Sequence, residues 1–209
     1  MATAAPTQTT RGLGKRQAIL DAAAELFADE GYARASIDAI ASRAGVSKPT
    51  VYSHFGNKEQ LFRESLAESA RQINEQSYAA AIALDVGTGW EESLHEVAEQ
   101  LVECQRSTCA SSLQRQLYAE INRDPEVFAI VRSRGAEPMI EALAGRLAML
   151  ANAGHLELDD PQLAAKQFFA LIGAEMPELT RLGTDRGDDR VVRASVQAGV
   201  YAFLRAYRA

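Results

Sequence analysis

Residues 36–62 read SIDAIASRAGVSKPTVYSHFGNKEQLF, and this stretch predicts two short helices joined by a tight Ala-Gly-Val turn, followed by the start of a third helix. The first helix has a single apolar stripe, because its apolar residues recur at the spacing of one helical face: Ile37, Ile40, Ala41 and Ala44. Ser36 stands where the N-cap of this helix belongs, and Gly45 supplies a stop just past its last apolar residue.

The second helix of this stretch is predicted to carry a polar, partly basic outer face. Ser47 is its N-cap candidate, and Pro49 lies in the first turn, where a missing N–H breaks no intrahelical hydrogen bond. Val51 and Phe55 point inward. The outer face of the helix is formed by Lys48, Thr50, Tyr52, Ser53 and His54. Two short helices around a glycine turn, with such a face on the second, are typical of a helix-turn-helix that enters the major groove of DNA. We therefore predict binding to double-stranded DNA.

The rest of the chain reads as helical. The protein has 209 residues, of which 47% are apolar, and this composition favours a helical globular protein over a disordered one. We expect an all-α fold with a three-helix head and a six-helix C-terminal bundle. The patterning divides the chain into a disordered N-terminal tail at residues 1–12, a DNA-binding domain at 13–57 and a C-terminal helical domain at 58–209. The resemblance described below implies that this last domain serves ligand binding and dimerisation.

The charge is unevenly distributed along the chain. The net charge is −6, yet residues 1–60 hold seven Lys/Arg against six Asp/Glu, so that the acidity resides in the remainder. A near-neutral head and an acidic body suit a protein that presents one face to phosphate. Because the head is not strongly basic, we expect a salt-sensitive affinity that rests on few phosphate contacts.

Other function classes find little support in the sequence. No apolar run is long enough to cross a bilayer, and Cys104 and Cys109 alone form no disulfide framework, so a soluble, cytoplasmic protein is expected. His54, His95 and His155 are scattered, which predicts no metal site, and no nucleotide fingerprint or nucleophile elbow follows a strand. We expect no cofactor and no enzymatic activity.

The same stretch and the segment before it also resemble a known family. The residues that carry the resemblance are Ile19, Ala22, Ala23, Leu26, Phe27, Glu30, Gly31 and Tyr32, then Ile40, Ala41, Ala44, Gly45, Val46 and Ser47, and finally Thr50, Val51, Tyr52, His54, Phe55, Lys58, Glu59, Leu61 and Phe62. In order and spacing they resemble the N-terminal DNA-binding domain of the TetR family of bacterial transcriptional regulators, over residues 13–64. Residues 117–124 and the segment DPQLAAKQFFALIG at 160–173 are similar to the AefR-like C-terminal subgroup.

The resemblance implies a set of DNA contacts. They are Ser36, Ser47, Lys48, Pro49, Thr50, Tyr52, His54 and Lys58. Tyrosine and lysine at these family positions bind phosphate, and the early positions of the recognition helix approach base edges. Lys48 and Thr50 suit base reading, since lysine donates to guanine and the threonine methyl touches thymine. Tyr52 and His54 have an alternative role, in which their rings pack against the head and only the tips meet solvent.

The last two predicted helices carry wide apolar faces. The residues involved are Phe168, Leu171, Ile172, Val192, Val196, Gly199 and Phe203. Sequence alone does not separate a core helix pair within one chain from an interface between two chains. The resemblance implies the latter, a two-fold four-helix interface of a homodimer, which also matches a palindromic operator.

The middle helices offer candidates for an effector pocket, a site that the resemblance implies. They are Trp90, Leu101, Cys104, Leu113, Leu117, Tyr118, Phe128 and Met139. Bundle interiors host such sites, although aromatic and methionine stripes at helical spacing also serve plain core packing. The apolar bias indicates a small hydrophobic or amphipathic effector.

The sequence therefore predicts a homodimeric, ligand-responsive transcriptional regulator that acts as a repressor at a palindromic operator. Two alternatives stay open. One is a DNA-binding regulator controlled by a protein partner or by no effector. The other is a helical binding protein or enzyme that uses the head only as a structural element.

Overall fold

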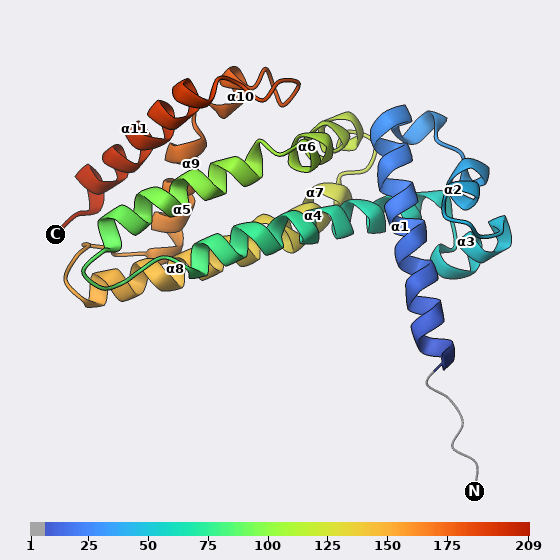
Figure 1. The fold of residues 1–209 in the computed structure, drawn as a ribbon, viewed down its shortest axis with the longest axis horizontal. Coiled ribbons are helices and arrows are strands. Elements are labelled where there is room, and N and C mark those ends of the chain that lie inside the picture. Colours follow the sequence, from blue (N-terminus) through green and yellow to red (C-terminus); the bar gives the residue numbers. More distant parts are fainter. Residues whose placement is uncertain (1–6) are drawn as a thin grey trace, which may run out of the picture. The chain divides into compact units, whose positions relative to one another are not determined.

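The computed structural model describes residues 7–209, and their side chains from residue 14 onward. Its helices are α1 (Thr7–Arg34), α2 (Ile37–Arg43), α3 (Lys48–Phe55), α4 (Lys58–Ile82), α5 (Trp90–Gln105), α6 (Thr108–Glu120), α7 (Glu126–Arg134), α8 (Ala136–Asn152), α9 (Pro161–Gly173), α10 (Met176–Leu179) and α11 (Asp189–Tyr207) (Figure 1). Within the described range the only β-type pairing is an isolated bridge between Leu156 and Arg208. The prediction of an all-α fold with a helix-turn-helix head is confirmed.

The chain divides into two compact units. The head unit comprises Met1–Ser69 and Gln116–Ile130, and the body unit comprises Ala70–Arg115 and Val131–Ala209. This division differs from the predicted boundary at residue 57, because α4 continues past that point and a second segment, from α6 to α7, joins the head unit. Of the predicted tail at residues 1–12, the first six residues lie outside the described chain, and α1 begins at Thr7.

The core of the head unit is built by α1, α2, α3 and the first part of α4. The apolar stripes of these helices supply Ile19, Leu20, Ala23, Leu26, Phe27, Ile37, Ile40, Val51, Phe55, Leu61, Phe62 and Leu66, all of them buried. Phe27 and Tyr32 each lie close to Phe62, with ring centroids 5.0 Å apart in both pairs. Gly31 adopts φ 78°, ψ 161°, a conformation open to glycine, and this interrupts the regular helical geometry of α1.

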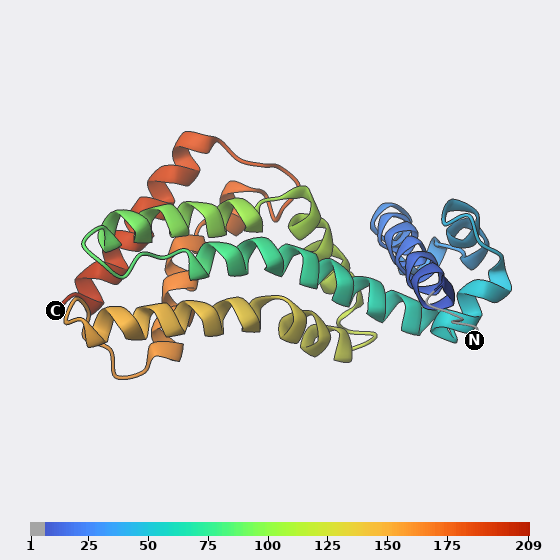
Figure 2. The same cartoon turned by 60° about the horizontal axis from the view of Figure 1, so that its bottom comes forward.

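The core of the body unit forms where α9 packs against α5, α8 and α11. In two views α5 and α8 run lengthwise, while α9 crosses them at a steep angle (Figures 1 and 2). Buried residues at this crossing include Leu94, Leu101, Leu143, Leu147, Phe168, Ile172, Val196 and Phe203. At Gly199 a Cβ atom would lie 2.6 Å from the carbonyl oxygen of Leu171, so only glycine lets α11 approach α9 this closely.

The part of the chain predicted as six helices contains eight, α4 to α11, because the helical sequence is interrupted at two places. The first break falls at Gly135, whose φ −104°, ψ −88° is not helical and separates α7 from α8. The second falls after Gly173: α9 ends there, and the short α10 begins at Met176 with Pro177 in its first turn, where proline has no N–H to donate. In the described part of the chain, no helix combines the length and apolarity needed to cross a membrane.

Candidate nucleic-acid interface

Helix α2 is fixed at both ends by local hydrogen bonds. Ser36 is its N-cap, as predicted, and its Oγ accepts a hydrogen bond of 3.1 Å from the N–H of Ala39. At the other end Gly45 has φ 64° and donates to the carbonyl oxygen of Ser42, while the N–H of Val46 donates to Ala41. This is the Schellman pattern, which satisfies the last carbonyl groups of a helix and turns the chain sharply. It sets where the next helix begins.

Helix α3 follows after the four residues 44–47. Ser47 occupies the N-cap position with extended φ −81°, ψ 152°, but its side chain makes no bond to the backbone. Its Oγ instead lies 2.8 Å from Oγ1 of Thr50. Pro49 lies in the first turn as predicted, and Gly56 with φ 74° ends the helix. Val51 and Phe55 are buried and hold α3 against the head unit.

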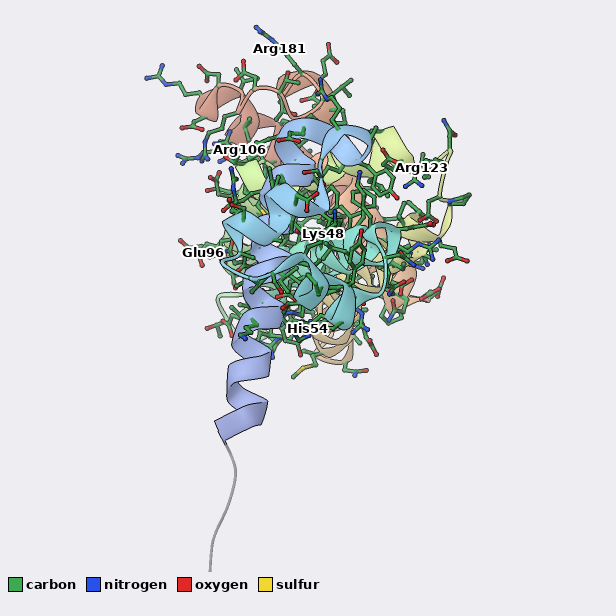
Figure 3. The ribbon with its side chains drawn as sticks, turned by 90° about the vertical axis from the view of Figure 1, so that its right-hand side faces the viewer. Lys48, His54, Glu96, Arg106, Arg123 and Arg181 are labelled. Carbon is green, nitrogen blue, oxygen red and sulfur yellow. The ribbon has the colours of Figure 1, made fainter. Side chains whose placement is uncertain are left out.

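The opposite face of α3 is open to solvent. Lys48, Pro49, Tyr52, Ser53 and His54 are exposed, and Thr50 is half-buried. Tyr52 is 42% exposed, a high value for a large aromatic residue. Lys48 and His54 lie on the side of the head unit that faces the viewer in Figure 3. The structure thus brings the predicted α3 residues together on one outward surface.

Lys48 has a partner that sequence reasoning missed. Its Nζ donates a hydrogen bond of 2.9 Å to Oδ2 of Asp38, in the first turn of α2. This hydrogen bond and the negative charge of Asp38 raise the pKa of Lys48, so the ammonium stays charged. The signal available in the sequence was an acidic residue two positions after the N-cap of α2, on the exposed side of its apolar stripe.

Lys58, at the start of α4, is engaged within the head unit. Its ammonium lies 3.3 Å from the carbonyl oxygen of Ala33 and 4.6 Å from the centre of the Tyr32 ring. Both contacts are weak enough to be exchanged, and Lys58 is partly exposed. A phosphate contact by Lys58 therefore requires a change of partner, unlike one by Tyr52.

A network of charges ties α4 to the segment between α6 and α7 inside the head unit. Nε and Nη2 of Arg63 donate to the two carboxylate oxygens of Asp124 at 2.6 and 2.9 Å, and Nη1 pairs with Glu126 at 2.7 Å. Asp124 is buried, and the hydrogen bond from Arg63 holds the pKa of this carboxyl below its usual range. The Arg123 guanidinium lies 3.9 Å from the Tyr32 ring centre.

The predicted pocket residues do not form one cluster within either unit. Trp90, Leu101, Leu113 and Met139 are buried in the body unit, and Cys104 there is partly exposed. Leu117, Tyr118 and Phe128 belong to the head unit, where Tyr118 and Phe128 are 61% and 47% exposed. Trp90 stacks on His155, with ring centroids 5.3 Å apart. The pocket assignment for these eight residues stays a prediction.

The body unit does hold an open groove of about 350 Å³ between α5 and α11. Its lining is strongly charged and includes Glu99, Glu103, Arg106, Arg186, Asp189 and Arg193. Arg106 is buried and pairs with Glu103 and Asp189 while donating to the Arg186 carbonyl oxygen at 3.1 Å. The charges in the groove are thus largely paired with one another, which indicates a structural role.

Most of the residues predicted for a dimer interface lie in the core of the single chain. Phe168, Ile172, Val192, Val196, Gly199 and Phe203 are buried within a single chain, and Leu171 is partly exposed. Phe168 and Phe203 meet edge to face, with centroids 5.0 Å apart. This burial favours the alternative of an internal helix pair, and a role of these residues in an interface between chains stays a prediction.

Comparison with known proteins agrees with the resemblance found in the sequence. Residues 19–65 match the bacterial regulatory proteins of the tetR family, and residues 92–209 match the C-terminal domain of AefR-like transcriptional repressors. The chain is 28% identical over 149 residues to the HTH-type transcriptional repressor AcnR of Corynebacterium efficiens, covering 71% of this chain and 72% of that protein. In several other curated relatives, by contrast, the match covers only 21% to 48% of the relative's length.

Solved structures extend the similarity over nearly the whole chain. A TetR-family transcriptional regulator from Mesorhizobium loti superposes with a TM-score of 0.87 at 30% identity, covering 95% of this chain and 99% of that one. The flavonoid-responsive regulator FrrA superposes with a TM-score of 0.77 at 30% identity, covering 93% of this chain and 97% of its own. The family match to residues 92–209 spans more than half of the sequence. This chain belongs to the TetR family of DNA-binding transcriptional regulators.

Proposed function

We propose that this protein acts as a homodimeric repressor that binds a palindromic operator and is released from it by a small effector. The observation that carries the DNA-binding part is the outward face of α3, on which Lys48, Tyr52 and His54 are all exposed. Two glycine-terminated helix ends fix its position, so this face is preorganised for a groove. The repressor assignment follows the AcnR relative and the AefR-like match.

The DNA contacts divide by chemistry. Ser36, Ser47, Tyr52, His54 and Lys58 offer hydroxyl, imidazole and ammonium donors to phosphate, which position the protein without reading sequence. Lys48, Pro49 and Thr50 lie in the first turn of α3, the part of a recognition helix that contacts base edges. Because Lys58 already contacts the Ala33 carbonyl, its phosphate contact replaces an existing interaction.

The test of this proposal is a random-site DNA selection with the full chain, followed by shift assays on the enriched sequence and on scrambled controls. We expect a palindromic or near-palindromic motif and an affinity that falls as salt rises. If the selection enriches no motif, the proposal of sequence-specific regulation is wrong, and the alternative in which the head is only a structural element is favoured.

The proposed partner surface is the outward side of α9 and α11. On α11 the exposed residues Val191, Ala194, Ala198, Tyr201 and Ala202 recur at helical spacing, opposite the buried stripe. On α9 the exposed residues include Leu163 and Ala170, and Ala174 is exposed at its C-cap. Small side chains let helices from two chains approach closely, and a C2 arrangement of two heads matches a palindrome.

The proposed effector is a small hydrophobic or amphipathic molecule held in the helical body. The FrrA relative is named as flavonoid-responsive, so aromatic polyphenols belong in the first set of compounds to be tried. A ligand releases the operator only if it binds one state of the protein better than the other. Compounds that raise the melting temperature and weaken the operator complex support this; a set that does neither, with DNA binding intact, points instead to control by a protein partner or to no effector.

A further inference from the structure

The contact between α2 and α3 brings an acidic and a basic side chain together on the exposed surface of the head unit. Lys48 Nζ lies 2.9 Å from Asp38 Oδ2, and the two side chains are 46% and 69% exposed. Both residues stand in the first turn of their helices, whose positions are fixed by caps and glycine turns. The pair therefore presents a hydrogen-bond donor and an acceptor side by side in a defined order.

This pair keeps most of its hydrogen-bonding capacity for a ligand. An ammonium has three N–H donors, and Lys48 contributes one of them to Asp38. An ionised carboxylate has about four acceptor positions on its two oxygens, and this bond occupies one of them. An exposed ion pair contributes little to folding stability, so the structure does not need this one for its core.

We propose that Asp38 and Lys48 act as one unit that selects a G·C base pair in each half-site of the operator. In the major groove guanine presents two acceptors, N7 and O6, and cytosine presents the N4 amino donor beside them. Lys48 donates to the guanine acceptors while Asp38 accepts from the cytosine amino group of the same base pair. The inference rests on the proposed DNA-binding function and adds to it a specificity-determining residue, Asp38.

Asp38 also acts against other base pairs. At an A·T pair the ammonium would meet the adenine amino donor beside N7, and the carboxylate would meet the O4 acceptor and the methyl group of thymine. A carboxylate that loses water without gaining a donor is strongly disfavoured, especially next to phosphates. The negative charge of Asp38 therefore lowers the affinity for DNA in general. This loss is offset only where a cytosine amino group donates a hydrogen bond to the carboxylate.

The experiment compares base preferences of the full chain and of three variants by random-site selection and then by titration of single-base-pair operator variants. For the wild type we expect a G·C pair in each half-site, preferred over A·T by roughly 5–150-fold. Asp38→Asn should reduce this preference to a few-fold while raising affinity for unrelated DNA. Lys48→Met should also reduce it, with lower affinity for every sequence. The double variant should lose no more of the G·C preference than the single variant with the larger loss.

Glu25→Gln is the matched control, because Glu25 forms an exposed ion pair of 3.0 Å with Arg43 in the same head unit. It removes one negative charge, so it should raise affinity uniformly and leave every base preference unchanged. If Asp38→Asn behaves like this control, with all preferences of the wild type retained, the inference is overturned while the proposed function stands. If the wild type enriches no motif, the proposed function itself fails. Melting curves of all variants check that the head remains folded.

Discussion

At the scale of single residues, close packing at Gly199 gives a direct prediction about stability. A Cβ atom there would lie 2.6 Å from the carbonyl oxygen of Leu171 and 2.8 Å from Cα of Ile172, both of them backbone atoms that cannot move aside. Gly199→Ala should therefore destabilise the fold by about 1–3 kcal/mol, the usual range for overpacking. Thermal or urea unfolding measures this change.

The control is Gly145→Ala on α8. Gly145 is exposed in a helix, and a Cβ there has no atom within 4 Å. Alanine loses less backbone entropy on folding, so this variant should gain about 0.5–1 kcal/mol of stability. Equal effects of the two substitutions would show that α9 and α11 do not pack as closely as the structure has them.

A second residue-scale prediction separates the phosphate contacts by charge. Tyr52→Phe removes a neutral donor, so it should weaken binding to all sequences with an unchanged salt dependence. Lys58→Ala removes a charge, so it should weaken binding to all sequences and also reduce the slope of log K against log salt by about one. Titrations at several salt concentrations measure both. A change in preference at one base position, with no uniform loss, would instead place either residue among the base readers.

At the scale of elements, the ion pair between Arg63 and Asp124 makes the stability of the head depend on pH. The pKa of Asp124 lies below its ordinary value because Arg63 donates hydrogen bonds to the carboxylate. A depressed pKa contributes stability that is fully present above the unfolded-state value of about 3.9 and is lost as pH falls through the folded-state value.

Asp124→Asn should consequently lower the free energy of unfolding near neutral pH. On acidification to about pH 3, the free energy of unfolding of this variant should fall by less than that of the wild type. Unfolding monitored at a series of pH values gives the two curves. The pKa values of Asp185 and Asp189 in the body unit are also lowered, and these residues contribute equally to the pH dependence of both proteins. The contribution of Asp124 is therefore the difference between the two curves. Curves that run parallel through the acid range would show that Asp124 contributes no pH dependence.

The same elements show what sequence alone could predict. The helix-turn-helix was predictable because its signals are local: Ser36 caps α2, Gly45 ends it, and Val51 and Phe55 fall on one face of α3. The pairing of Arg63 with Asp124 was not, since 61 positions separate the two residues and either could have faced solvent. The break between α9 and α10 is hard to predict because apolar periodicity continues through Gly173 into Met176.

At the scale of the whole molecule, the apolar stripe of α11 illustrates why assembly is hard to read from sequence. Val192, Val196 and Phe203 are buried against α9 in the same chain, and Ala194 and Ala198 are exposed on the other side. Hydrophobic periodicity shows that a helix buries a face but does not identify what covers it. The small exposed residues, which carry little hydrophobic signal, are the ones we propose for the partner.

Ala198→Arg should therefore split the homodimer. A charged side chain placed in a close helix–helix contact loses its water without gaining a partner, which is strongly unfavourable. Because a single head reaches only one half-site, operator affinity should fall along with the dimer, while the melting curve of the chain still shows cooperative unfolding. Sedimentation measures the assembly state, and a shift assay with full and half operators measures binding. Ala79→Arg, at an exposed position of α4, is the control and should leave both unchanged. A wild-type monomer that binds a palindrome tightly, or an Ala198→Arg protein that remains dimeric, would remove this face of α11 from the assembly.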